Sequence, residues 1–149
     1  MGYTTEFQGK FEFNGAVDVE TLTFLRKLNA TRRMKRKLGP EYGVEGEMYV
    51  DGGGDFGQAS EPSVIDHNMP PRTQPSLWCG WVPSDDGTGI VWDGGEKFYE
   101  YVAWLEWIIT KVLAPKGYAI SGFMKWRGED FDDAGRIVVL NNRITVERA

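Results

Sequence analysis

The sequence predicts an α+β fold in which a mainly antiparallel sheet carries two amphipathic helices on one face. Apolar residues between Glu96 and Leu113 recur at helical spacing and occupy a stripe roughly 120° wide. Residues Thr5 to Phe13 alternate between apolar and polar, as in a strand with one side in water. The expected elements follow the order β-α-β, loop, β-β-α-β-β(-β), which allows a ferredoxin-like arrangement.

The composition is that of one globular domain. The chain has 149 residues, of which 41% are hydrophobic and 26% charged, so we expect a single domain over residues 1–149 with a long loop at 52–76. The one cysteine, Cys79, excludes an internal disulfide and fits a reducing cytoplasm. The N-terminus lacks an apolar signal-peptide core, and no apolar run approaches the roughly 18 residues of a membrane span. We therefore expect a cytoplasmic protein with no membrane partner.

The net charge of −5 is unevenly distributed. Seven of the 17 cationic residues lie between Arg26 and Lys37, where no acid is present, so the rest of the chain is strongly acidic. This pattern argues against binding of extended nucleic acid, which favours a broad positive face. The segment permits a local anion site with Arg32, Arg33 and Arg36 as candidates. The alternative is a solvated helix end.

The first strand is followed by a turn at Asn14-Gly15 and by a helix from Val19 to about Thr31, for which Asp18 is the expected N-cap. The buried face of this helix is expected to contain Leu22, Leu25 and Leu28, with Phe24 or Val19 beside them.

The basic residues Arg32 to Lys37 come next, either as a last helical turn, where cations suit the helix dipole, or as a loop that ends at Gly39-Pro40. A short strand from Glu47 to Asp51 then leads into the loop 52–76, which is rich in Gly, Pro, Ser, Asp and Asn. Loops of this length are commonly functional or disordered.

In the second half, Leu77 to Val82 and Thr88 to Trp92 are expected to pair as a hairpin with its turn at Asp86-Gly87. The main helix follows, capped by Asp93 or Gly94 and stopped by Pro115 and Gly117. The last expected elements are a hairpin of Tyr118 to Trp126 with Arg136 to Leu140, a turn at Asn141-Asn142 and a short strand from Arg143 to Glu147.

Tryptophan is the most informative residue type. Of the six tryptophans, five lie between positions 78 and 107. In a strand, Trp78 and Trp81 project to opposite faces, and Trp107 points about 180° away from the centre of the helical stripe with Trp104 on its flank. We expect core packing to account for about three of the six and the others to meet a ligand or a second protein surface.

The glycine-rich run Gly52 to Gly57 satisfies G-x-G-x-x-G, but the residues Gln58 to Pro62 that follow are poor helix sequence. We therefore expect either a loop that closes over a ligand or a plain linker, not a dinucleotide fold.

The single histidine, His67, follows Asp66 and could act as a base oriented by a carboxylate. The alternative is a surface histidine. One histidine and one cysteine make a zinc site improbable. Four acids crowd one hairpin loop and could bind calcium, although a solvated turn is the favoured interpretation: Glu129, Asp130, Asp132 and Asp133. We expect no metal and no cofactor.

Two runs carry a resemblance: Trp92-Asp93-Gly94-Gly95-Glu96-Lys97-Phe98-Tyr99-Glu100-Tyr101-Val102 and Trp126-Arg127-Gly128-Glu129-Asp130. With these runs the chain resembles a family of small proteins encoded by bacteria and bacteriophages. The likeness covers most of the chain but implies no activity and no site residues. The phage association implies a context of binding a host protein or sequestering a host nucleotide signal as counter-defence.

The leading hypothesis is a non-enzymatic protein that sequesters a small anionic ligand of the nucleotide type. Aromatic rings would stack on the base (Trp78, Trp81, Trp104 and Phe56), cations would hold the phosphate (Arg32, Arg33, Arg36 and Arg72), and the loop 52–76 would close over the site. One alternative is a protein-interaction module, a homo-oligomer or an inhibitor of a host protein, that docks through Trp107 and Trp104. The other is a hydrolase that uses His67 with Asp66.

Overall fold

The computed structural model describes residues 2–50 and 62–149. Two main helices occur in these residues, α1 (Val19–Ala30) and α2 (Tyr101–Ile108). Three shorter helical turns accompany them: the 3-10 turn η1 (Pro40–Tyr42), the π turn η3 (Ile109–Leu113) and the 3-10 turn η4 (Ala114–Lys116). Because η3 and η4 follow α2 directly, the predicted helix reaches its expected end at Leu113, although its last part is not α-helical.

The larger sheet has six strands within the described residues, in the order β4-β5-β1-β6-β7-β8, and all neighbours are antiparallel. The strands are β1 (Glu6–Phe13), β4 (Trp81–Pro83), β5 (Gly89–Trp92), β6 (Ile120–Arg127), β7 (Ala134–Leu140) and β8 (Arg143–Arg148). A separate two-stranded sheet pairs β2 (Lys35–Arg36) with β3 (Val64–Asp66). The predicted α+β class with a mainly antiparallel sheet is confirmed.

The connections explain why both helices lie on one face. α1 joins β1 to β4, and these two strands run parallel with β5 between them. α2 joins β5 to β6 in the same way, with β1 between them. This order is compatible with the ferredoxin-like arrangement that the sequence allows, extended by β7 and β8.

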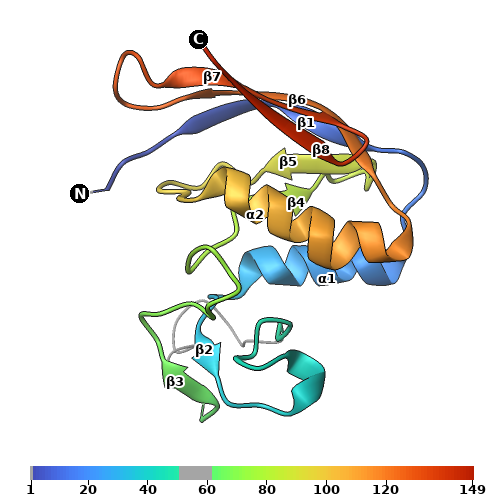
Figure 1. Ribbon diagram of the computed structural model, residues 1–149, viewed down its shortest axis with the longest axis vertical. Helices are drawn as coiled ribbons and strands as arrows, with labels where there is room; N and C mark the ends of the chain where they lie inside the picture. Colours follow the sequence, from blue (N-terminus) through green and yellow to red (C-terminus); the bar gives the residue numbers. More distant parts are fainter. Residues whose placement is uncertain (1, 51–61) are drawn as a thin grey trace.

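The elements form three layers (Figure 1). The six-stranded sheet lies on one side, α1 and α2 cover one of its faces, and β2, β3 and η1 lie beyond the helices. Residues 72–76 of the segment between β3 and β4 lie against α2. The helices are therefore packed between the sheet and a second layer of the same chain.

Aromatic rings gather around Phe7 of β1. The centroid of the Phe7 ring lies 5.0–5.9 Å from the centroids of four other rings, in edge-to-face or tilted geometry. These rings belong to Trp81, Trp92, Phe98 and Tyr101. Because they come from β4, β5, the loop before α2 and α2, one strand position joins elements from both halves of the chain.

Local signals place most elements where the sequence predicts them. The alternation of β1 buries Phe7 and Phe11, and the carboxylate of Asp18 caps α1 by accepting a hydrogen bond from Thr21 N. Leu25 and Leu28 are buried as expected, whereas Val19 is exposed. The β4–β5 hairpin, the β6–β7 hairpin and the final strand β8 are also confirmed.

The basic segment and the residues after it differ from the prediction. Lys35 and Arg36 form β2 rather than a helical turn or a loop, because the backbone becomes extended at Thr31. Residues 47–48 form a turn and residues 49–50 are irregular instead of forming a strand, and the Glu47 carboxylate accepts from Glu45 N at 3.0 Å and Thr73 Oγ1 at 2.6 Å. Within the expected loop, positions 52–61 lie outside the described residues, and β3 follows them.

The main helix begins later than the sequence predicts. α2 begins at Tyr101, and Glu100, not Asp93 or Gly94, occupies the N-cap position. The Phe98 side chain is buried against Gly80, where an added Cβ would lie 2.4 Å from its ring. Burying this ring requires the chain to turn at Lys97 and Glu100, both of which have a φ of 58°. This turn is incompatible with helix before Tyr101.

Trp107 is not at the protein surface, because its side chain is only 5% exposed, so it is not available as the predicted interface residue. The segment 72–76 covers this side of α2: Trp104 Nε1 donates to Ser76 Oγ at 2.8 Å, and residues 72–75 lie beside Trp107. The Trp104 and Trp107 rings pack edge to face at 5.7 Å. The cover that the tryptophans require is therefore supplied by the chain itself.

Replacing Trp107 should consequently affect folding. We expect Trp107→Ala to lower the free energy of unfolding by about 3–5 kcal/mol, the usual cost of truncating a buried aromatic residue. Urea denaturation measures this change. Trp78→Ala, at a position that is 42% exposed, is the matched control and should cost far less; equal losses would contradict the burial of Trp107.

The N-terminal segment is joined to the acidic loop between β6 and β7. Tyr3 Oη donates to Asp133 Oδ2 at 2.7 Å, and Trp126 Nε1 donates to Asp133 Oδ1 at 2.9 Å. Thr4 N donates to the carboxylate of Glu129. These acids thus have a structural role, and the hydrogen bonds from Tyr3 and Trp126 lower the pKa of Asp133.

A carboxyl group whose pKa is lowered by folding stabilises the protein above its unfolded pKa of about 3.9, and this contribution is lost as the pH falls through the folded value. We therefore expect Asp133→Asn to make the free energy of unfolding less dependent on pH below about pH 4. Urea denaturation over a pH series measures the difference. Asp132→Asn, in the same loop, is the control, and identical pH profiles for wild type and Asp133→Asn would refute this role.

Candidate ligand-binding site

A cavity lies where the end of α1, the segment 68–80 and the loop 93–99 before α2 meet. Its volume is about 670 Å³, within the range of small-molecule sites. Much of the wall is apolar or aromatic: Pro70, Pro75, Leu77, Trp78, Phe98 and Tyr99. The polar side chains are Asn29, Asn68, Ser76, Asp93, Glu96 and Lys97. An apolar cavity with a few converging polar groups is the usual form of a ligand site.

Two aromatic side chains of this cavity remain accessible. Trp78 is 42% exposed and Tyr99 is 47% exposed. All six tryptophans are described, and four of the others are buried while Trp92 is half-buried. Large accessible rings in a concave surface are suited to stacking on a planar ligand.

Asn29 fixes the geometry of the cavity. Its Nδ2 donates to Cys79 O at 2.8 Å and to Asp93 Oδ2 at 2.9 Å. The other oxygen of Asp93 accepts from Gly95 N at 2.7 Å. One amide therefore joins α1, the approach to β4 and the loop 93–99.

The loop has an unusual backbone. Gly94, Lys97 and Glu100 have φ values of 83°, 58° and 58°. The left-handed conformation costs a non-glycine residue of order 1–3 kcal/mol and persists where the surroundings fix it, often at ligand sites. Here the buried Phe98 supplies that constraint, and the neighbouring Lys97 and Tyr99 line the cavity.

Arg33 and Arg36 do not lie on a solvated face, because their side chains are only 2% and 1% exposed. Arg33 donates from Nε to Gln74 Oε1 at 3.2 Å and from its second terminal nitrogen to Glu47 O at 2.9 Å. Burial and the nearby Arg36 lower the pKa of Arg33 to about 10. Arg36 stacks on the Tyr49 ring at 4.3 Å. Both guanidinium groups organise the second layer and do not line the cavity.

The other predicted cations are at the surface. Arg32 Nε donates to His67 O at 3.0 Å, and the next residue, Asn68, lines the cavity. Arg72 is exposed and forms an ion pair with Glu45 at 3.3 Å, away from the cavity. None of these predicted cations lines the cavity: Arg33 N donates to the carbonyl oxygen of the wall residue Leu77 at 2.7 Å, and Arg32 reaches the carbonyl group of His67, next to Asn68.

The remaining predicted aromatic residues have other positions. Trp81 and Trp104 are core residues that are 1% and 0% exposed, so the expectation that about three tryptophans suffice for the core is wrong. Trp81 Nε1 donates to Tyr101 O at 2.8 Å. Phe56 lies outside the described residues. Of the predicted stacking residues that the structure describes, Trp78 alone lines the cavity.

His67 and Asp66 are exposed, and the Asp66 carboxylate accepts from Asn68 N at 2.9 Å. No hydrogen bond joins the His67 imidazole to Asp66 in the described residues.

The part of the chain that the structure describes contains no group of three or more His, Cys, Asp or Glu that could hold a metal ion. It also contains no helix with the length and apolar character needed to cross a membrane.

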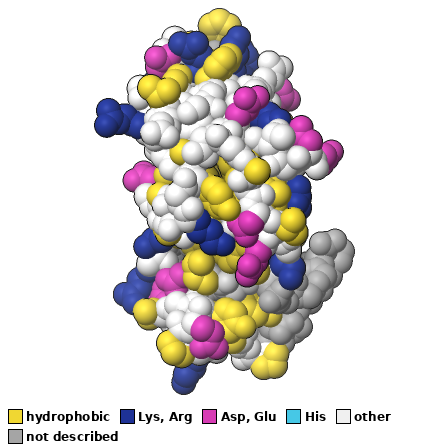
Figure 2. Space-filling model, turned by 90° about the vertical axis from the view of Figure 1, so that its right-hand side faces the viewer, with side chains coloured by type: hydrophobic (Ala, Val, Ile, Leu, Met, Phe, Trp, Pro, Cys, Tyr) yellow, Lys and Arg dark blue, Asp and Glu magenta, His cyan; other side chains and the backbone are white. Residues whose placement is uncertain are grey.

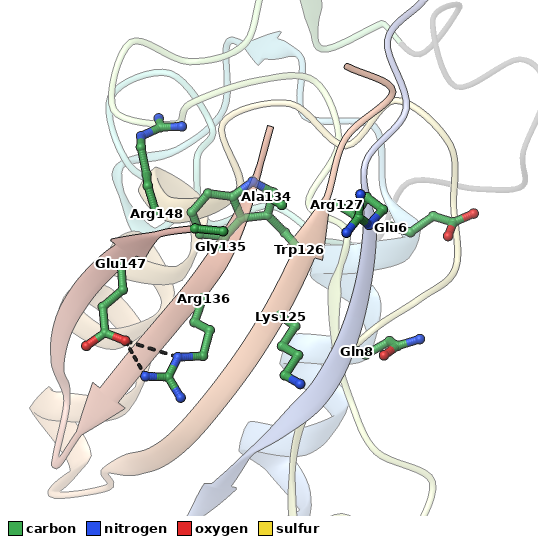
Figure 3. Close-up of a pocket in the computed structure, with 11 residues that line it drawn as sticks. Glu6, Gln8, Lys125, Trp126, Arg127, Ala134, Gly135, Arg136, Glu147 and Arg148 are labelled. Carbon is green, nitrogen blue, oxygen red and sulfur yellow. Dashed lines mark hydrogen bonds and ion pairs between the residues drawn. The ribbon is translucent and has the colours of Figure 1, made fainter. Parts of the chain in front are cut away.

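A second depression lies on the face of the sheet opposite the helices and has a volume of about 540 Å³. Figure 3 shows Lys125, Arg136 and Glu147 projecting side by side from neighbouring strands. Glu147 accepts from Arg136 Nε at 3.0 Å, so part of the positive charge is compensated. On the face shown in Figure 2, cationic and acidic side chains are interspersed. The aromatic residue that lines this depression, Trp126, is buried, whereas the cavity beside Trp78 presents accessible rings.

Sequence reasoning named Trp78 and Arg32 but missed Asn29, Asp93, Lys97 and Tyr99. Three of these four lie in the run from Trp92 to Val102, which carries the family resemblance. No family model, no curated protein and no solved structure matches the chain. The function must therefore be inferred from the site itself.

Cys79 also borders the cavity, but its thiol is shielded. Burial raises the pKa of this thiol to about 12, so about one thiol in ten thousand is ionised at pH 8. We expect the native protein to resist alkylation by iodoacetamide at pH 8 and the urea-unfolded protein to react completely. Mass spectrometry measures the added group; rapid reaction of native protein would contradict the packing of this wall.

Proposed function

We propose that the chain is a non-enzymatic protein that binds and sequesters a small ligand of the nucleotide type in the cavity beside Trp78. The observation that carries this proposal is the accessible indole ring of Trp78, which is 42% exposed in a cavity of about 670 Å³. A planar base stacked on this ring would cover apolar surface that is otherwise in water.

The polar lining supports recognition of a base. Asn68 carries a side-chain amide on the same cavity as Trp78 and Tyr99, whereas the Ser76 hydroxyl already accepts from Trp104 Nε1 and lies within hydrogen-bonding distance of the carbonyl oxygens of Trp78 and Tyr99. Amide groups can pair with the edges of a base whose faces are stacked on aromatic rings. Both oxygens of Asp93 already accept hydrogen bonds from the protein, so its main role is to hold the loop.

The anionic part of the ligand has two candidate partners. Lys97 lines the cavity, and Arg32, which is not a wall residue, donates to the carbonyl oxygen of His67, the neighbour of the wall residue Asn68. Lysine and arginine side chains can both hold a phosphate group.

A panel of mono-, di- and cyclic nucleotides tests the proposal by thermal unfolding and calorimetry. A ligand at 100 times its dissociation constant should stabilise the protein by about 2.7 kcal/mol. Trp78→Ala should weaken binding by about 1–3 kcal/mol, the usual contribution of base stacking. Phe123→Ala is the matched control, because Phe123 is 47% exposed on the opposite face of the sheet.

Lys97→Gln separates the two parts of the ligand. It should weaken a bound nucleotide more than the corresponding nucleoside, because only the nucleotide has a phosphate group. The proposal is rejected if no member of the panel binds, or if Trp78→Ala binds as tightly as wild type and Phe123→Ala.

A further inference from the structure

β8 is an open edge of the six-stranded sheet. It is the last strand in the sheet order and pairs with β7 over its whole length, from Arg143 opposite Leu140 to Arg148 opposite Gly135, in an unbroken register. In the described residues no element pairs with its other side. Natural sheets usually protect such an edge with charged side chains, a proline, a bulge or a covering segment, because its free backbone groups can pair with another strand; β8 has charged side chains but neither a proline nor a bulge.

The backbone of β8 shows which residues face the open side. Asn141 and Asn142 have φ values of 49° and 71°, which is typical of a two-residue type I′ hairpin. Ala149 N donates to Ala134 O at 2.9 Å. Because the backbone groups of successive strand residues point alternately to the two sides, the residues at odd-numbered positions direct their N–H and C=O groups towards β7. The N–H and C=O groups of Ile144 and Val146 therefore point away from β7.

We propose that β8 pairs antiparallel with β8 of a second copy of this chain, across a twofold axis at Thr145. In this register Ile144 of each copy lies opposite Val146 of the other, and these are the residues whose backbone groups face the edge. The two six-stranded sheets become one continuous sheet.

The side chains are complementary in the same register. Arg143 of each copy lies opposite Glu147 of the other, which gives two opposite-charge pairs on the outer face of the sheet. The inner face gains two pairs of Ile144 with Val146. On the outer face, Thr145 of one copy lies opposite Thr145 of the other. Sliding the strands by two residues in either direction places Ile144 opposite Arg148 or Arg143 opposite Thr145, so both alternatives lose the charge pairs.

Apolar exposure at the edge supports the same partner. Val146 is 43% exposed and borders a groove of about 260 Å³ between β8 and α2, together with Val102 and Ala103. A second β8 strand would place its own Ile144 and Val146 beside this groove. Pairing would thus cover apolar side chains as well as backbone groups.

Sedimentation velocity tests the proposal with two charge reversals. Wild type should form a dimer, and Arg143→Glu and Glu147→Arg should each raise the dimer dissociation constant roughly 10-fold, because each places like charges opposite one another. An equimolar mixture of the two variants should recover dimers, because every charged pair between different variants is then complementary. Lys125→Glu is the control: it reverses a charge on β6, away from the edge.

The mixture also removes one ambiguity. Glu147 forms a bond with Arg136 of its own chain, and Glu147→Arg loses this bond in the mixture as well, so recovery of dimers there must come from contact between copies.

Val146→Pro removes an N–H from the open edge without removing a bond to β7 and should give a folded monomer. Monomeric wild type at the highest concentration attainable, or failure of the mixture to recover dimers, overturns the proposal.

Discussion

The side-chain amide of Asn29 connects the three parts of the chain that surround the ligand cavity. From the last turns of α1 it reaches the carbonyl group of Cys79 and the carboxylate of Asp93. The bond to the Cys79 carbonyl is partly buried, so its loss would cost free energy, and the bond to the exposed Asp93 carboxylate joins the loop 93–99 to the same amide. The positions of Trp78 and Tyr99 depend on this amide together with the buried Phe98 and with Ser76, whose hydroxyl lies within hydrogen-bonding distance of the carbonyl oxygens of both residues.

The second layer determines which residues are available to a partner. It covers the side of α2 that carries Trp104 and Trp107, and it shields the side chains of Arg33 and Arg36 from solvent. Arg33 has no carboxylate partner in the described residues and donates to a carbonyl group and an amide oxygen instead. A buried charge of this kind is expensive unless its hydrogen bonds fix a particular arrangement. The cations that resemble an anion site in the sequence therefore stabilise the interior.

Features that depend on neighbouring residues could be predicted from the sequence. The alternation of β1, the cap at Asp18 and the Asn141-Asn142 turn each act over a few positions. The start of α2, the burial of Trp107 and the assembly of the cavity could not be predicted, because they depend on segments far apart in the chain. Asn29 and Asp93 are 64 positions apart in the chain and meet through the tertiary fold. Trp78 was identifiable as an excess tryptophan, whereas nothing local distinguishes Tyr99 or Lys97.

The unequal shielding of the six indole rings has an optical consequence. A ring in water emits at longer wavelength than one in an apolar interior, and a dissolved collisional quencher reaches accessible rings first. Since Trp78 is exposed while four of the others are buried and Trp92 is half-buried, the red-shifted, quencher-accessible part of the intrinsic fluorescence comes mainly from the cavity wall. The protein thus contains its own reporter of events in that cavity, with no added label.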